Sequence, residues 1–150
     1  MSKNLINFSD LTKKEIFDLI ELANNFKSED SLDYRYENLF PDKKIVSMFC
    51  EPSTRTKLSF EIAAHNLGAT FIDFDLDNSS MQKGETLDDT LAAMEMMGVD
   101  LCVLRHTESV IHGLVENFAN MQFINAGEGA ISHPTQALID LMTIHEAKDK

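Results

Sequence analysis

Residues 44–61 read KIVSMFCEPSTRTKLSFE, and this stretch decides the fold class. Its first six residues, 44–49, form a short apolar run that is typical of a buried strand. Residues 54–67 then have the pattern of a helix, with Gly68 placed as its C-terminal stop. A buried strand that turns into a helix is the repeating unit of parallel α/β sheets. The stretch therefore predicts one such unit, with its turn at 50–53.

The alternation of strand and helix continues to the end of the chain. We expect further strands at 70–74, 101–104 and 121–125, and further helices at 12–27, 86–97, 109–118 and 134–148. Loops are expected at 28–42, 75–84 and 127–132. Four strand–helix units predict an α/β fold: a three-layer domain with a four-stranded, or slightly larger, parallel sheet flanked by helices. Its crossovers should be right-handed.

Two of the expected helices carry signals for their ends or their buried faces. Thr12 and Glu15 form a capping-box pattern at the start of the first helix. On the helix after the first strand, Leu58, Phe60 and Ile62 are the apolar residues expected to face inward. These patterns predict where that first helix begins and which side chains of the second reach the core.

Composition argues against several classes of partner. The 150 residues suit one domain, and the net charge of −12 argues against nucleic acid, which binds basic surfaces. No apolar run approaches the roughly 20 residues of a membrane span, and the first residues lack the pattern of a signal peptide, so we expect a cytoplasmic protein without membrane contact. Cys50 and Cys102 read as reduced core thiols, and no Cys/His spacing indicates a metal. We expect no cofactor.

Only four basic residues lie between positions 45 and 147, a span that holds fifteen acidic ones. They are Arg55, Lys57, Lys83 and Arg105. All except Lys57 fall in the segments that follow predicted strands. Because ligands of open parallel sheets bind beyond the carboxyl ends of the strands, these cations are expected on one rim. The pattern predicts a site for a small anion there.

The tetrapeptide Ser53-Thr54-Arg55-Thr56 has the chemistry that a phosphate requires. N–H groups at a helix start lack intrahelical partners, and the helix dipole adds partial positive charge. Its three hydroxyls are further donors, and Arg55 can bind two phosphate oxygens at once. The tetrapeptide alone also fits a plain helix N-cap with a surface arginine, but the other rim cations favour the phosphate site. Neither a Walker loop nor a dinucleotide fingerprint is present.

A second polar group follows the last predicted strand. His133 precedes Pro134, which begins a helix, and Gln136 lies on the first turn of that helix. The positive end of the helix dipole disfavours an imidazolium, so we expect a neutral His133 that donates one hydrogen bond to a carbonyl oxygen. The rim is rich in donors and lacks a nucleophile set. This favours transfer from an activated phosphate compound to an external nucleophile, without a covalent enzyme intermediate.

Four of these motifs together resemble a known family. Residues 49–61, FCEPSTRTKLSFE, closely resemble the carbamoyl phosphate signature of the aspartate and ornithine carbamoyltransferases. The motifs KGET at 83–86, RH at 105–106 and HPTQ at 133–136 match that family in order and spacing. Two details favour its aspartate branch: the lysine before Gly-Glu in the second motif, KGET, and the threonine in the last motif, where ornithine enzymes usually have cysteine.

The resemblance implies a role for each matching residue. The phosphate of carbamoyl phosphate would be held by Ser53, Thr54, Arg55 and Thr56. The carbamoyl oxygen would be polarised by Arg105, His133 and Thr56, and the carbamoyl amide would be contacted by Gln136. In this family the loop that carries Ser79 and Lys83 reaches into the active site of a neighbouring subunit. The implied assembly is a homotrimer with shared active sites, with association to a regulatory subunit left open.

The resemblance covers nearly all of this chain, but family members are about twice as long. We therefore expect residues 1–150 to be the carbamoyl phosphate domain, with 134–150 as the helix that leads toward an absent aspartate-binding domain. The implied reaction transfers the carbamoyl group to L-aspartate, an early step of pyrimidine synthesis, and this chain alone is expected to be inactive. Two alternatives are an ornithine or other carbamoyltransferase, and a binding module for carbamoyl phosphate or phosphate without turnover.

Overall fold

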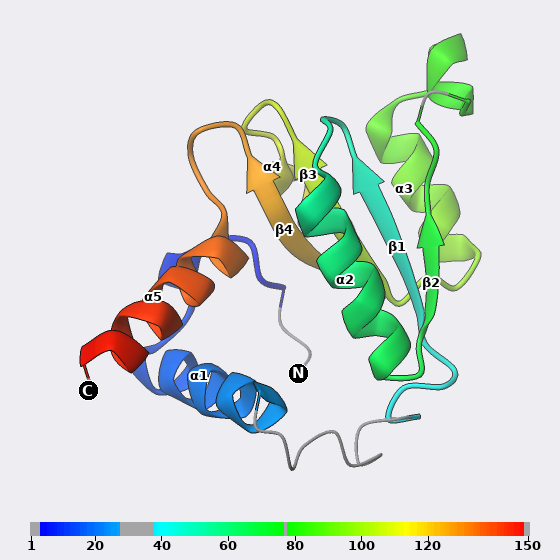
Figure 1. The fold of residues 1–150 in the computed structure, drawn as a ribbon. Coiled ribbons are helices and arrows are strands. Elements are labelled where there is room, and N and C mark those ends of the chain that lie inside the picture. The colour runs from blue at the N-terminus through cyan, green and yellow to red at the C-terminus, as the bar shows by residue number, and fades with distance from the viewer. Residues whose placement is uncertain (1–3, 28–37, 77, 149–150) are drawn as a thin grey trace.

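The computed structural model describes residues 4–27, 38–76 and 78–148, which form an α/β domain around one parallel sheet (Figure 1). The strands lie in the order β2-β1-β3-β4. Their bounds are β1 (Lys44–Phe49), β2 (Thr70–Asp73), β3 (Leu101–His106) and β4 (Gln122–Glu128). All neighbouring strands pair in parallel, so the predicted four-stranded parallel sheet is confirmed.

Helices cover both faces of this sheet, as expected for three layers. On one face lies α2 (Thr54–Asn66), and on the other lie α3 (Leu87–Met96) and α4 (Ile111–Val115) (Figure 1). Beside the β4 edge, α1 (Lys13–Lys27) packs against α5 (Pro134–Lys148). The capping box is present at the start of α1, where Thr12 N–H donates to Glu15 across 2.7 Å. No described helix is long and apolar enough to cross a membrane.

The alternation of side chains along the strands divides the core into two parts. Met48, Leu104 and Phe123 pack with Leu91 of α3 and Ile111 of α4 in the larger part, and all five are fully buried. The smaller part lies under α2 and consists of Phe49, Val103 and Ala126, with Ile45 and Phe60 packed against it. Successive strand residues point to opposite faces, so neighbours in sequence contribute to different parts.

The expected inward face of α2 is partly wrong. Leu58 and Ile62 are each 51% exposed, whereas Ala64 is buried and Phe60 packs on the sheet. Phe60 and Ala64 are four residues apart and share one helix face, and positions two residues from Phe60 lie on the opposite side. The helix therefore contacts the sheet through a large and a small residue.

Strands β3 and β4 run further than the sequence predicts. Cys50 N–H donates to the carbonyl of Arg105, and Gly129 N–H donates to that of His106, so pairing continues to the rim on both sides of β3. Residues 105–106 and 127–128 therefore belong to strands and not to loops. In contrast, α4 is shorter than the expected 109–118.

The expected loops hold smaller deviations. The 75–84 segment contains a short 3-10 helix at Ser80–Lys83, so it is not wholly irregular. Most of the loop expected at 28–42 lies outside the described residues. Leu5 forms a parallel bridge with Ile124, which places residues near the N-terminus along β4.

Candidate functional site

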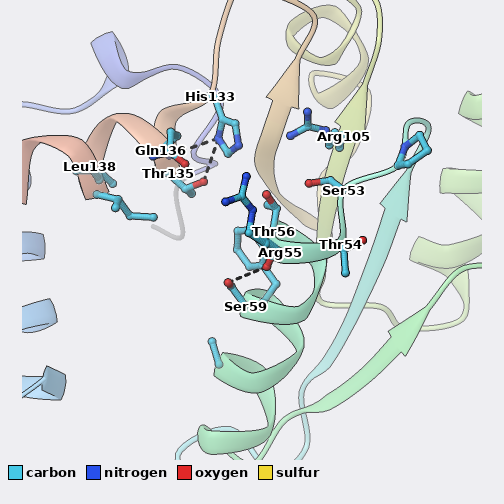
Figure 2. Close-up of a pocket in the computed structure, with 14 residues that line it drawn as sticks. Ser53, Thr54, Arg55, Thr56, Ser59, Arg105, His133, Thr135, Gln136 and Leu138 are labelled. Atoms are coloured by element: carbon cyan, nitrogen blue, oxygen red, sulfur yellow. Dashed lines mark hydrogen bonds between the residues drawn. The ribbon is translucent and has the colours of Figure 1, made fainter.

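A cavity of about 990 Å3 opens at the carboxyl end of the sheet, between α2 and α5 (Figure 2). It brings together the predicted phosphate loop and the polar residues that follow β3 and β4. Its lining consists of Pro52, Ser53, Thr54, Arg55, Thr56, Ser59, Phe60, Ala63, Arg105, His133, Thr135, Gln136, Leu138 and Ile139. Seven residues that sequence reasoning placed in a substrate site are therefore found in one cavity.

The start of α2 presents its backbone and side-chain donors to this cavity. Ser53 is the N-cap residue, and its side chain makes no capping hydrogen bond, so its hydroxyl is not used by the helix. The first N–H groups of a helix have no intrahelical partner and carry partial positive charge. Arg55 extends from this first turn toward the side of the cavity where His133 lies (Figure 2). The predicted helix start is thus suited to an anion.

Arg105 is fixed at the end of β3 by two acceptors. Its Nε donates to Oε1 of Glu51 across 2.6 Å, and its Nη1 donates to the carbonyl oxygen of Ala126 across 3.0 Å. Gly127 leaves the room for this arrangement, because a Cβ there would lie 2.6 Å from Nη1 of Arg105 and 3.4 Å from Cδ2 of His133. The guanidinium and the imidazole therefore flank the same glycine.

His133 caps α5 through its ring. Nδ1 accepts a hydrogen bond from the backbone N–H of Gln136 across 3.3 Å, and the Thr135 hydroxyl lies at the same distance from it (Figure 2). Because Nδ1 is an acceptor here, the neutral ring carries its proton on Nε2. Burial and the charge of Arg105 lower the pKa of His133, against an opposing effect of Asp140. The direction agrees with the expected neutral imidazole, and its causes are burial and Arg105.

Gln136 lines the cavity, but its side chain lies along its own helix. Its Nε2 donates to Oδ1 of Asp140, one turn further on, across 2.9 Å. A rotation of this exposed side chain would direct the amide into the cavity. Gln136 is therefore in the predicted place without the predicted orientation.

Three polar residues from the sequence argument lie outside this cavity. Lys57 pairs with Asp73 at the end of β2 and lies over the ring of Phe49, so its side chain points toward β2 and away from the cavity. Ser79 donates to the carbonyl of Leu76, and the exposed Lys83 ends the 3-10 helix. Of the three cations expected on the rim, Arg55, Lys83 and Arg105, only Arg55 and Arg105 line the cavity.

Glu51 is the site residue that sequence reasoning missed. It lies in the motif at residues 49–61, but neither the chemistry of a helix start nor the resemblance assigns it a role. A carboxylate next to a phosphate loop in a chain with few cations is the signal that could have assigned it as the partner of Arg105. The ion pair keeps the guanidinium in place and partly neutralises it.

The thiols and carboxylates near the site do not suggest other chemistry. Burial raises the pKa of Cys50 and raises that of Cys102 to about 12, so both remain protonated thiols. Within the described ranges no group of three or more His, Cys, Asp or Glu side chains could hold a metal ion. The polar part of the cavity lining thus consists of hydrogen-bonding groups and two guanidinium groups, beside apolar residues such as Phe60 and Leu138.

This fold and cavity define a class of protein: a parallel α/β domain with a cationic site at the carboxyl ends of its strands. Residues 3–146 match the family described as aspartate/ornithine carbamoyltransferase, carbamoyl-P binding domain, and the chain belongs to this family.

Individual relatives agree with this assignment. The chain is 46% identical over 144 residues to the aspartate carbamoyltransferase catalytic subunit of Aliarcobacter butzleri, a match that covers 96% of this chain and 47% of the relative. It is 42% identical to that of Caldanaerobacter subterraneus over 99% of this chain and 48% of the relative. A crystal structure of aspartate transcarbamoylase from Trypanosoma cruzi in complex with carbamoyl phosphate superposes with a TM-score of 0.87 at 33% identity, over 96% of this chain and 46% of that one. The chain thus spans about half the length of these relatives.

Proposed function

We propose that this chain forms the carbamoyl phosphate half of an aspartate carbamoyltransferase. The complete enzyme would transfer the carbamoyl group to the amino group of L-aspartate, giving N-carbamoyl-L-aspartate and phosphate, early in pyrimidine synthesis. The observation that carries the proposal is the meeting of the 53–56 helix start with Arg105 and His133 in one cavity. The family match and the similarity to aspartate carbamoyltransferase catalytic subunits support it.

The proposed chemistry uses binding and polarisation only. The 53–56 segment holds the phosphate through N–H groups, hydroxyls and the Arg55 guanidinium. Arg105, Thr56 and the Nε2–H of His133 donate to the carbamoyl oxygen, while Gln136 turns to the carbamoyl amide. The amine attacks the carbonyl carbon, negative charge grows on its oxygen, and these donors stabilise it. The bond from carbon to the bridging oxygen then breaks, phosphate leaves and the amine loses its proton.

The second acidic substrate calls for more positive charge than Arg55 and Arg105 supply. We propose that Ser79 and Lys83 of a neighbouring subunit complete the site in a homotrimer. Both residues lie on a loop outside the cavity of their own chain, which suits a role in another subunit. Sedimentation of the full-length protein tests this: a trimer is expected, and a monomer at micromolar concentration would contradict it. Regulatory subunits and the cytoplasmic location stay predictions from the sequence.

Two alternatives are separated from this proposal by one pair of measurements. Phosphorus NMR titration with carbamoyl phosphate measures binding to this chain, and a carbamoylation assay on the full-length protein uses aspartate and ornithine as acceptors. We expect binding here, with turnover of aspartate by the full-length protein. Turnover of ornithine instead would assign the other branch of the family, and binding without any turnover would support a binding module. If neither this 150-residue chain nor the full-length protein bound carbamoyl phosphate, the site assignment would be refuted.

A further inference from the structure

We propose that Glu128 is a positioning residue, whose buried carboxylate holds the 127–132 loop and through it sets the placement of Arg105 and His133. The inference rests on the proposed function, because Arg105 and His133 are the groups assigned there to the carbamoyl oxygen. Glu128 is 2% exposed and is the only acidic side chain buried to this extent in the described ranges. A carboxylate is costly to bury unless hydrogen bonds compensate it, so its contacts indicate what it does.

The Glu128 carboxylate joins two elements. Oε1 accepts a hydrogen bond from the backbone N–H of Ile111, at the start of α4, across 2.6 Å. Oε2 faces Nδ2 of Asn125 on β4 at 3.5 Å. Glu128 therefore connects the helix behind the sheet with the strand that leads to the loop.

Asn125 extends this connection to Gly127 and to the N-terminal segment. Its Nδ2 donates to the carbonyl of Ile6 across 3.0 Å, and its Oδ1 accepts from the N–H of Gly127 across 2.9 Å. These two contacts fix which end of the amide is oxygen. Asn125, itself fully buried, thereby holds the residue that lies between Arg105 and His133.

The 127–132 loop is held by hydrogen bonds within it and by hydrogen bonds to other segments. Glu128 N–H donates to the carbonyl of Ser132 across 2.9 Å, and the Ser132 hydroxyl donates to the carbonyl of Ile6 across 3.2 Å. Gly129 N–H reaches the carbonyl of His106 across 3.0 Å. Because Ser132 directly precedes His133, movement of this loop moves the imidazole. One buried network thus positions both Arg105 and His133, the pair proposed to bind the carbamoyl oxygen.

The network requires a carboxylate and not an amide. Two donors converge on Glu128, namely the Ile111 N–H and the Asn125 amide, and a carboxylate accepts from both. A glutamine that keeps the Ile111 bond must present its own NH2 group to the NH2 group of Asn125. This conflict would loosen Asn125 from Gly127 with almost no change in side-chain volume.

The test is Glu128→Gln in the 150-residue chain, with two probes that report on different parts of the cavity. Carbamoyl phosphate uses Arg105 and His133, whereas inorganic phosphate needs only the 53–56 segment. We expect carbamoyl phosphate to bind about tenfold more weakly and inorganic phosphate within about twofold of wild type, as loss of oriented hydrogen bonds predicts. The matched control is Glu95→Gln, because Glu95 accepts from the N–H groups of Asn120 and Met121 at the opposite end of the sheet. It should leave both affinities unchanged.

A second readout needs no ligand. Ring 15N spectra should show Nε2 protonated in wild type and a mixture of tautomers in Glu128→Gln, while Glu95→Gln keeps the wild-type pattern. The inference would be overturned if Glu128→Gln bound carbamoyl phosphate with wild-type affinity and its ring spectrum were unchanged. It would also be overturned if the variant bound carbamoyl phosphate and inorganic phosphate more weakly by the same factor. If that variant does not fold, Ser132→Ala removes one hydrogen bond of the same network. It must then weaken the binding of carbamoyl phosphate more than that of inorganic phosphate. Failure of both the wild-type 150-residue chain and the full-length protein to bind carbamoyl phosphate would refute the proposed function, and the ring spectrum would still decide the role of Glu128.

Discussion

Glu51 and Arg105 form an ion pair at the rim of the sheet, in which Nε of Arg105 donates to Oε1 of Glu51 across 2.6 Å. Both side chains are mostly buried, with exposed fractions of 29% and 20%. The carbonyl of Ala126 holds the Nη1 group of the same guanidinium. An anion that approaches Arg105 therefore competes with Glu51 for the same positive charge.

Replacement of Glu51 by glutamine should strengthen the binding of carbamoyl phosphate, the ligand that the proposed function assigns to Arg105. The amide oxygen can still accept from Arg105, so the guanidinium keeps its place, but the competing negative charge is removed. We expect a gain of about 1 kcal/mol, roughly fivefold in the dissociation constant. Phosphorus NMR titration at low salt measures it. Weaker carbamoyl phosphate binding would show that the carboxylate is needed to orient Arg105 more than it competes for its charge.

Arg55→Ala should weaken carbamoyl phosphate binding by ~2–4 kcal/mol, the cost of losing a bidentate, charge-assisted pair in the cavity. Arg55 extends into the cavity from the first turn of α2, where a phosphate would also meet the helix N-terminus. Titration calorimetry or phosphorus NMR gives the change directly. An unchanged dissociation constant would remove Arg55 from the site.

Lys57→Ala is the matched control for Arg55→Ala. It deletes a cation two residues further along the same helix, but Lys57 Nζ is engaged by Asp73 at 3.0 Å outside the cavity. Only long-range attraction is lost, and solvent screens it, so the affinity should change by less than about 1 kcal/mol. A loss as large as that of Arg55→Ala would mean that net charge, and not contact, governs binding.

The sequence predicted the sheet well because local signals and burial agree there. The run 44–49 is both apolar and followed by a helix start, and its predicted bounds match β1. The prediction for α2 was poorer because three apolar residues lie within five positions of that helix. Local sequence could not decide whether Leu58 and Ile62 or Phe60 and Ala64 would meet the sheet, since the choice depends on which residues of β1 and β3 lie beneath.

The candidate site was predictable as a set of residues, but not as an arrangement. Arg55, Arg105 and His133 follow from their positions after strands, where parallel sheets bind ligands. The arrangement depends on three side-chain orientations. Glu51 pairs with Arg105, Lys57 points to Asp73, and the His133 ring caps α5. The first two depend on contacts between segments that are separate in the sequence, and the third depends on which rotamer His133 adopts.

The lowered pKa of His133 should make the folded state less stable in acid. Burial and Arg105 favour the neutral ring in the native state, whereas the unfolded chain titrates near the ordinary value of 6.5. The stability contributed by this group is therefore complete above pH 6.5 and is lost as the pH falls through the folded pKa. Urea unfolding between pH 5 and 7.5, with an NMR titration of the ring, measures both quantities.

His133→Asn provides the control for this pH dependence. Asparagine is a good N-cap residue, so it can keep the bond from the Gln136 N–H, but it does not titrate in this range. The variant should lose the part of the pH slope that His133 contributes near and below pH 6.5. A native ring pKa at or above 6.5, or an identical slope in the variant, would contradict the assignment.

Gly127→Ala should both destabilise the fold and disturb the site. Gly127 has φ of +128°, a conformation that alanine rarely adopts, and the added Cβ would lie 2.6 Å from Nη1 of Arg105. The strain costs about 1–3 kcal/mol, and the guanidinium has to leave Ala126, so carbamoyl phosphate binding should weaken as well. Urea unfolding and phosphorus NMR titration measure the two effects separately.

Gly113→Ala tests whether any added methyl group would have the same consequence. Gly113 lies within α4, and a Cβ there meets nothing within 4 Å. Alanine is the better helix former, so this variant should be more stable than wild type by about 0.5–1 kcal/mol, with its ligand affinity unchanged. If the free energy of unfolding falls in Gly127→Ala and rises in Gly113→Ala, the effect of Gly127 is due to its place between Arg105 and His133. Destabilisation by both would point instead to a general intolerance of added methyl groups in this domain.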